Sequence, residues 1–188
     1  MDKEKALKEI EGKIEAAQAA VSISYIIGTG CWMKDMSTYA TPATITIKSA
    51  KNDHLLKIID PRKIVTRYED PKMVNNDSIN IIRLSIVDML TQTFEIVKTY
   101  SKETDQYEIF QKRPWFHFMR HLRNAFNHNF IFTGIGSKDQ PSHIQFSDRK
   151  IEITESMNGI EIDLDILPIK YCYELGDIML TSFKTDFK

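Results

Sequence analysis

The sequence has little cysteine and no long apolar run. Its 188 residues include two cysteines, Cys31 and Cys172, which lie far apart in the chain. Two distant thiols exclude a disulfide-rich scaffold and a cysteine-based zinc site, and they favour a reducing compartment. No stretch approaches the roughly 18 consecutive apolar residues of a membrane span, and the charged N-terminus is unlike a signal peptide. We therefore expect a cytoplasmic protein that makes no contact with a membrane.

Glycine, proline and net charge are also low. The chain has 7 glycines and 6 prolines, and its formal net charge is −1. Because 42% of the residues are hydrophobic and 27% are charged, the composition is that of an ordinary globular protein. A chain of this length can bury a core of its own, so we expect a single domain over residues 1–188. With so little net charge, any binding of nucleic acid must depend on a local basic patch.

The first half of the chain has helical periodicity, except in residues 31–73. Apolar residues three and four apart predict a helix over residues 3–26 that Gly28 and Gly30 end. A second helix is predicted over residues 78–100, with Asp77 or Ser78 as its N-cap. We expect its buried stripe to consist of Ile79, Ile82, Ile86, Leu90, Phe94 and Val97. Between these helices lies an irregular, insertion-like stretch, residues 31–73, with a short strand at 43–47 and a short helix at 49–59.

The second half predicts shorter elements. Pro114 disfavours a continuous helix, so we expect a cap at Thr104 or Asp105, a break near Lys112 and a fresh helix from Pro114 to about residue 129. Strand patterns follow at 144–146, 151–154 and 160–164, and Asn158-Gly159 between the last two predicts a hairpin. A helical period returns after Pro168 and would bury Cys172. The fold predicted from these patterns is all-α, with a small β-hairpin before the last helix.

The segment from Arg113 to Asn129 concentrates basic and amide side chains. No acidic residue occurs between Ile109 and Lys138. At about 100° per residue, one face of the predicted helix is polar and the opposite face is apolar. The polar face would carry His117, His121, Asn124 and His128, flanked by Arg113, Arg120 and Asn127. The apolar face would carry Trp115, Phe118, Met119, Leu122, Ala125 and Phe126.

A polar stripe is often only the solvated face of a helix, but such faces usually consist of lysine and glutamate. Imidazole can accept and return a proton near neutral pH, and guanidinium binds phosphate. The pair suits RNA cleavage through attack by the ribose 2′-OH, and it equally suits nucleotide binding without turnover. His117 and His121 lack a neighbouring carboxylate or thiolate to complete a metal site, so we expect no metal and no cofactor.

The order Arg123-Asn124-Ala125-Phe126-Asn127-His128 resembles the Arg-x4-His signature of the HEPN superfamily, the higher eukaryotes and prokaryotes nucleotide-binding domains. The block from Pro114 to Ala125, the Asn-Gly hairpin and the closing helix are similar to a bacterial branch of that superfamily. This resemblance implies a HEPN-like bundle of four or five helices. It also implies a homodimer and a metal-independent endoribonuclease that acts as a toxin or defence effector.

The resemblance also implies the roles of individual residues. Arg123 and His128 would be the catalytic pair and Asn124 a supporting polar residue, while the substrate-binding candidates are Arg120, His121, Asn127 and His117. On a regular helix Arg123 and His128 point about 140° apart, so two copies across a two-fold interface would assemble a joint site. The implied partners are RNA or a nucleotide, a second copy and an antitoxin protein. The alternatives are a non-catalytic nucleotide- or RNA-binding HEPN module and a helical interaction protein.

Overall fold

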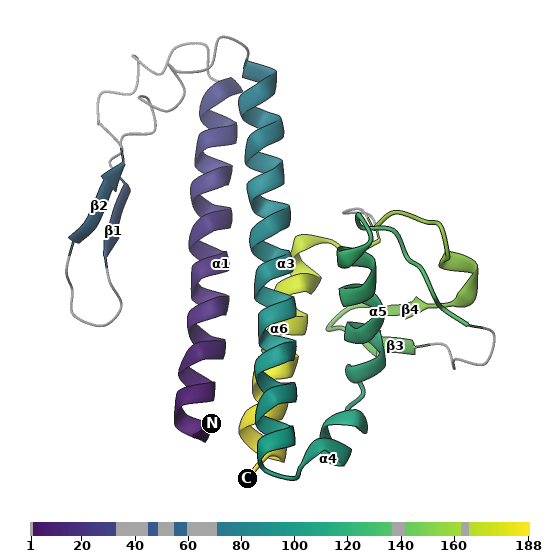
Figure 1. Ribbon diagram of the computed structural model, residues 1–188. Coiled ribbons are helices and arrows are strands. Elements are labelled where there is room, and N and C mark those ends of the chain that lie inside the picture. The colour runs from purple at the N-terminus through teal and green to yellow at the C-terminus, as the bar shows by residue number, and fades with distance from the viewer. Residues whose placement is uncertain (1, 33–44, 49–54, 60–70, 137–141, 163–165) are drawn as a thin grey trace. The chain divides into compact units, whose positions relative to one another are not determined.

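The computed structural model describes residues 2–32, 45–48, 55–59, 71–136, 142–162 and 166–188 (Figure 1). The chain divides into two compact units. One consists of Met1–Ala16 with Ile86–Lys188, and the other of Ala17–Ser85. Two long helices, α1 (Lys3–Trp32) and α3 (Pro71–Glu103), have parts in both units. The single domain over residues 1–188 stays a prediction.

The unit over Ala17–Ser85 contains a hairpin between its helical parts. Strand β1 (Ile45–Lys48) pairs antiparallel with β2 (Leu55–Ile59). The predicted strand is therefore confirmed over residues 45–47. The short helix predicted over residues 49–59 is wrong for residues 55–59, which form β2 and pair with β1. Residues 49–54 lie outside the described part.

Both long helices extend past their predicted ends. Helix α1 continues through Gly28 and Gly30, and α3 begins at Pro71, so the predicted stop and the predicted N-cap at Asp77 or Ser78 are wrong. Glycine inside a helix costs only about 1 kcal/mol relative to alanine, which neighbouring turns can offset. Proline suits the first helical position because the amide it lacks would have no partner inside the helix.

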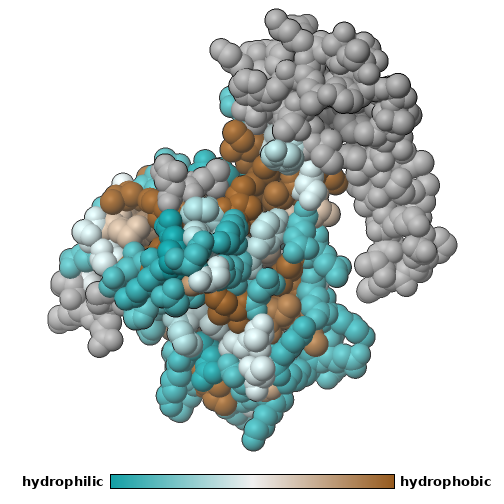
Figure 2. Space-filling view, turned by 180° about the vertical axis from the view of Figure 1, so that it is seen from behind, coloured by the Kyte–Doolittle hydropathy of each residue, from teal (hydrophilic) through white to brown (hydrophobic). Residues whose placement is uncertain are grey.

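The core of the first unit forms where three helices meet. Gly176 of α6 (Ile169–Asp186) lies so close to α3 that an added Cβ would stand 3.5 Å from the Met89 Cε and 3.8 Å from the Ile14 Cδ1 of α1. On α3 the buried stripe is confirmed for Ile86, Leu90, Phe94 and Val97. Ile79, predicted to be buried, is 41% exposed and is a correction. On the face shown in Figure 2, most of the described surface is hydrophilic, with hydrophobic surface gathered in limited areas.

Two short helices follow α3. They are α4 (Tyr107–Gln111) and α5 (Phe116–Asn127), so the predicted break before Pro114 is confirmed. The N-cap of α4 is Gln106 rather than Thr104 or Asp105, because Asp105 takes a left-handed conformation (φ 55°) in the turn. An aromatic cluster fixes this corner against α3, with ring centroids 5.0–6.2 Å apart, and it consists of Phe94, Phe110, Trp115 and Phe116.

A small antiparallel hairpin before the last helix is confirmed, but its turn is not the predicted one. Strand β3 (Ser142–Gln145) pairs with β4 (Lys150–Ile153), and the Phe146 amide donates to the Arg149 carbonyl across the turn. Asn158 instead follows the short 3-10 helix η2 (Glu155–Met157). Its side chain accepts from the Ile135 amide and donates to the Ile135 carbonyl, so it joins two loops. The described residues are thus mostly helical, with this hairpin packed beside α5 (Figure 1).

Candidate functional site

Helix α5 carries the candidate site on an amphipathic frame. The predicted apolar face is confirmed for five of its members, each 1% exposed or less, namely Trp115, Phe118, Met119, Leu122 and Ala125. Phe126 is half-buried. On the polar side His117, Asn127 and His128 are exposed, whereas Arg120, Arg123 and Asn124 are half-buried. Three of the predicted polar side chains are therefore exposed to solvent and three are partly accessible, while the apolar face holds the helix in place.

His121 departs from the predicted exposed stripe. It is 3% exposed, although the helical wheel grouped it with His117 and Asn124. At about 100° per residue His121 lies only about 60° from Phe118, at the edge of the apolar arc. Because that arc packs against the rest of the unit, its edge is covered as well. The structure therefore separates His121 from the polar groups that solvent reaches.

Arg123 has a carboxylate partner that the motif does not contain. Its Nη1 donates to Glu95 Oε1 of α3, 28 residues earlier in the chain, and its guanidinium carbon lies 5.8 Å from the centroid of the Phe94 ring. The Arg123 Nε is buried and has no hydrogen-bond partner within the described residues. Packing against α3 thus places Arg123 over an aromatic ring and beside an acid. The Arg-x4-His pattern carries no signal for Glu95, because Glu95 lies on another helix, 28 residues before Arg123.

Glu95 is part of a small charged cluster on α3. Lys98 lies one turn along the same helix, and its Nζ is 2.9 Å from Glu95 Oε2. Partial burial raises the pKa of Glu95, but hydrogen bonds and charges from Lys98 and Arg123 outweigh it, so the pKa falls below its ordinary 4.5. Glu95 is therefore ionised at neutral pH. A phosphate that approaches Arg123 must share the guanidinium with this carboxylate or displace it.

His128 lies just beyond the end of α5. Its amide donates to the Ala125 carbonyl and its own carbonyl accepts from the Ile131 amide, both at 3.0 Å. The next two residues, Asn129 and Phe130, have φ angles of 55° and 65°. Asparagine tolerates this left-handed region, but phenylalanine rarely adopts it, so the turn is locally strained. The helical-wheel angle between Arg123 and His128 does not apply, because His128 has left the helix.

Neighbouring backbone holds this strained turn in place. The Phe130 carbonyl accepts from the Ile162 amide at 2.7 Å, and Ile131 forms an isolated antiparallel bridge with Glu161. The Phe130 ring packs edge-on against Phe126, with centroids 5.8 Å apart. The conformation after His128 is therefore set by the loop that follows η2, and the imidazole projects from an anchored turn.

Other candidate chemistry is sparse in the part of the chain that the structure describes. No group of three or more histidine, cysteine, aspartate or glutamate side chains there is arranged to hold a metal ion. Cys172 is 3% exposed, as predicted, and burial raises the pKa of its thiol to about 12. None of the described helices is long and apolar enough to cross a membrane.

Comparisons of the chain with protein-family models, curated proteins and solved structures found no match. The structure brings together Arg123, Glu95 and Phe94, and it places His128 and Asn124 near the end of the same short helix. This arrangement offers one guanidinium and one solvent-exposed imidazole within a short stretch of chain.

Proposed function

We propose that this chain is a metal-independent endoribonuclease of the HEPN type that acts as a toxin or defence effector. The observation that carries the proposal is the placement of the motif pair at the end of α5. Arg123 is held over Phe94 with a partly exposed guanidinium, and His128 is exposed at an anchored, strained turn. Strained backbone conformations cluster at functional sites.

In the proposed reaction, the groups act on one phosphodiester of RNA. The His128 imidazole removes the proton from a ribose 2′-OH, and the 2′ oxygen attacks the adjacent phosphorus. Arg123 binds the non-bridging oxygens, on which negative charge accumulates. The bond to the 5′ oxygen then breaks, and the imidazolium protonates that leaving oxygen. The products are a 2′,3′-cyclic phosphate and a 5′-hydroxyl.

A second copy of the chain completes the proposed site. Each copy offers Arg123 on α5 and His128 just beyond its end, and a two-fold axis would place the His128 of one copy near the Arg123 of the other. Asn124, half-buried one turn before His128, supports the backbone contacts of the bound strand together with Arg120, Asn127 and His117. An antitoxin protein is the further partner that this function implies.

The test is an RNA cleavage assay in EDTA, with structured and single-stranded substrates. Wild type should cleave and His128→Ala should lose at least about 100-fold in rate, the usual scale of general acid–base catalysis. His143→Ala is the matched control, since His143 is an exposed histidine on β3, and it should keep full activity. If folded wild type cleaves no RNA, or if His128→Ala cleaves normally, the proposed reaction is wrong.

The ion pair between Arg123 and Glu95 favours a second candidate function, a non-catalytic nucleotide- or RNA-binding module. Glu95 already offsets part of the Arg123 charge, so the guanidinium has less charge to stabilise a transition state. It can still share hydrogen bonds with a bound phosphate. This candidate predicts saturable binding that weakens steeply with salt, with the RNA recovered intact.

A further inference from the structure

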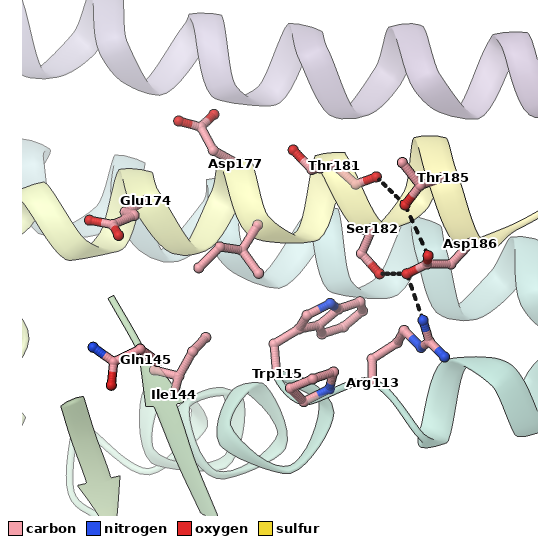
Figure 3. Close-up of a pocket in the computed structure, with 12 residues that line it drawn as sticks. Arg113, Trp115, Ile144, Gln145, Glu174, Asp177, Thr181, Ser182, Thr185 and Asp186 are labelled. Carbon is pink, nitrogen blue, oxygen red and sulfur yellow. Dashed lines mark hydrogen bonds and ion pairs between the residues drawn. The ribbon is translucent and has the colours of Figure 1, made fainter. Parts of the chain in front are cut away.

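A pocket of about 620 Å³ lies in the first unit between the start of α5, strand β3 and helix α6 (Figure 3). Pro114, Trp115, Ile144 and Ile178 form its apolar walls, and α6 adds carboxylates and hydroxyls. The volume lies within the range of about 300–1,000 Å³ that is common for ligand sites. Trp115 precedes Arg123 by eight residues, about 12 Å along a helix, so the pocket is separate from the proposed catalytic pair.

The charged groups of the pocket are mainly acidic. Among the described residues that line the pocket, Arg113 supplies the one guanidinium, and its Nη1 lies 2.6 Å from Asp186 Oδ2. The Glu174 carboxylate accepts hydrogen bonds from the amide and the hydroxyl of Ser147. Asp177 is exposed and has no hydrogen-bond or ion-pair partner in the described part of the chain. With Arg113 neutralised by Asp186, the remaining two carboxylates give the pocket a net negative charge.

The apolar wall also contains a hydrogen-bond donor without an acceptor. Trp115 is 1% exposed, and its indole Nε1 has no hydrogen-bond partner among the residues that the structure describes. In Figure 3 the indole stands at the start of α5 with its nitrogen edge turned toward α6. Buried indole N–H groups usually find an acceptor. A ligand acceptor in the pocket would satisfy this donor.

We propose that the pocket binds an arginine or lysine residue of a peptide from a partner protein. The hydrocarbon stem would pack against Ile144 and Ile178, the charged end would lie beside Asp177 and Glu174, and a peptide carbonyl would accept from the Trp115 indole. The acceptor must be neutral, because a carboxylate or phosphate would be repelled by the same two acids. A simple amine supplies the charge but no acceptor, whereas a basic peptide supplies both. This site is independent of the proposed ribonuclease activity.

The test follows the indole signals of the full-length chain by NMR. Trp32 and Trp115 each give one indole N–H resonance, and Trp32→Phe identifies the one from Trp115. The probe is the blocked peptide acetyl-Ala-Leu-Arg-Leu-Ala-amide, which should shift the Trp115 resonance saturably. The same peptide with neutral citrulline in place of arginine should bind at least about fivefold more weakly. Ethylguanidinium, which has no carbonyl, should leave the indole resonance in place.

Two variants separate the pocket from general charge effects. Asp177→Asn should weaken peptide binding about two- to fivefold, the scale of an exposed ion pair. Glu155→Gln removes an exposed carboxylate that does not line the pocket, so it should bind the peptide as wild type does. The proposal is overturned if millimolar peptide leaves the Trp115 resonance unmoved, if the citrulline peptide binds equally well, or if Asp177→Asn has no effect in a folded protein.

Discussion

The ion pair between Glu95 and Arg123 predicts opposite effects of one substitution on stability and on RNA binding. Glu95→Gln removes the carboxylate charge but keeps an oxygen that can accept from the Arg123 Nη1. The two side chains are 40% and 29% exposed, so solvent screens the pair, and such pairs contribute at most about 1 kcal/mol. We expect Glu95→Gln to lower the free energy of unfolding by up to about 1 kcal/mol, which corresponds to a fall in Tm of about 2–4 °C.

The stability difference should depend on pH in a defined direction. The pKa of Glu95 lies below its ordinary 4.5 in the folded chain, because Lys98 and Arg123 outweigh the opposing effect of burial. A carboxylate with a depressed folded pKa stabilises the protein above its unfolded pKa and loses that contribution as the pH falls through the folded pKa. The difference in the free energy of unfolding between wild type and Glu95→Gln should be constant near neutral pH and shrink below pH 4.5. Urea denaturation at a series of pH values measures it.

The same substitution should strengthen RNA binding. Without the Glu95 charge, a phosphate competes only with a neutral amide oxygen for Arg123, and the affinity should rise by up to about fivefold, equivalent to about 1 kcal/mol. One additional phosphate contact should steepen the slope of log affinity against log salt by about 0.7 for single-stranded RNA. Fluorescence anisotropy with labelled RNA provides both values, and Glu103→Gln on the same helix is the control. Weaker binding by folded Glu95→Gln would refute competition between Glu95 and phosphate.

Three further predictions concern the frame of the protein. Phe110 is 0% exposed among aromatic rings, so Phe110→Ala should lower the free energy of unfolding by about 3–5 kcal/mol in urea titrations, and a loss under about 1 kcal/mol would contradict this packing. Gly159 has φ +85°, so Gly159→Ala should destabilise the protein by about 1–2 kcal/mol. Gly12 is an exposed glycine inside α1, so Gly12→Ala should stabilise the protein by about 0.5–1 kcal/mol. Thermal melts in which both variants shift Tm in the same direction would be inconsistent with these conformations. Burial raises the pKa of the Cys172 thiol to about 12. In a Cys31→Ser variant, an alkylating reagent at pH 8 should therefore label Cys172 only as the chain unfolds. Immediate labelling would show that the thiol is accessible in the folded chain.

Local patterns correctly predicted several elements of the fold. The proline at position 114 marked the break between α4 and α5, and the period of three and four marked the apolar face of α5. The alternation of β3 and β4 indicated strands before the last helix. These signals succeed because each depends on the geometry of residues that are near one another in the chain.

The wrong predictions share a cause. Gly28 and Gly30 were expected to end a helix, and Asn158-Gly159 was expected to close a hairpin. Each preference amounts to about 1 kcal/mol, and packing or another hydrogen bond can exceed it. Helix α1 continues through both glycines, and the Asn158 side chain joins the Ile135 backbone to the loop after η2. Turn and end signals are therefore weaker than the tertiary contacts that compete with them.

At the candidate site, the order of residues sets which groups follow one another along the chain: a guanidinium at Arg123, an amide at Asn124 and an imidazole at His128. The surroundings of these groups depend on helix packing. Docking of α5 on α3 pairs Arg123 with Glu95 over the Phe94 ring, and His121 is buried in the folded chain. The periodicity of a helix shows which residues share a face, but it carries no information on which distant helix covers that face. The partners of Arg123 are therefore fixed by helix packing across 28 residues of chain.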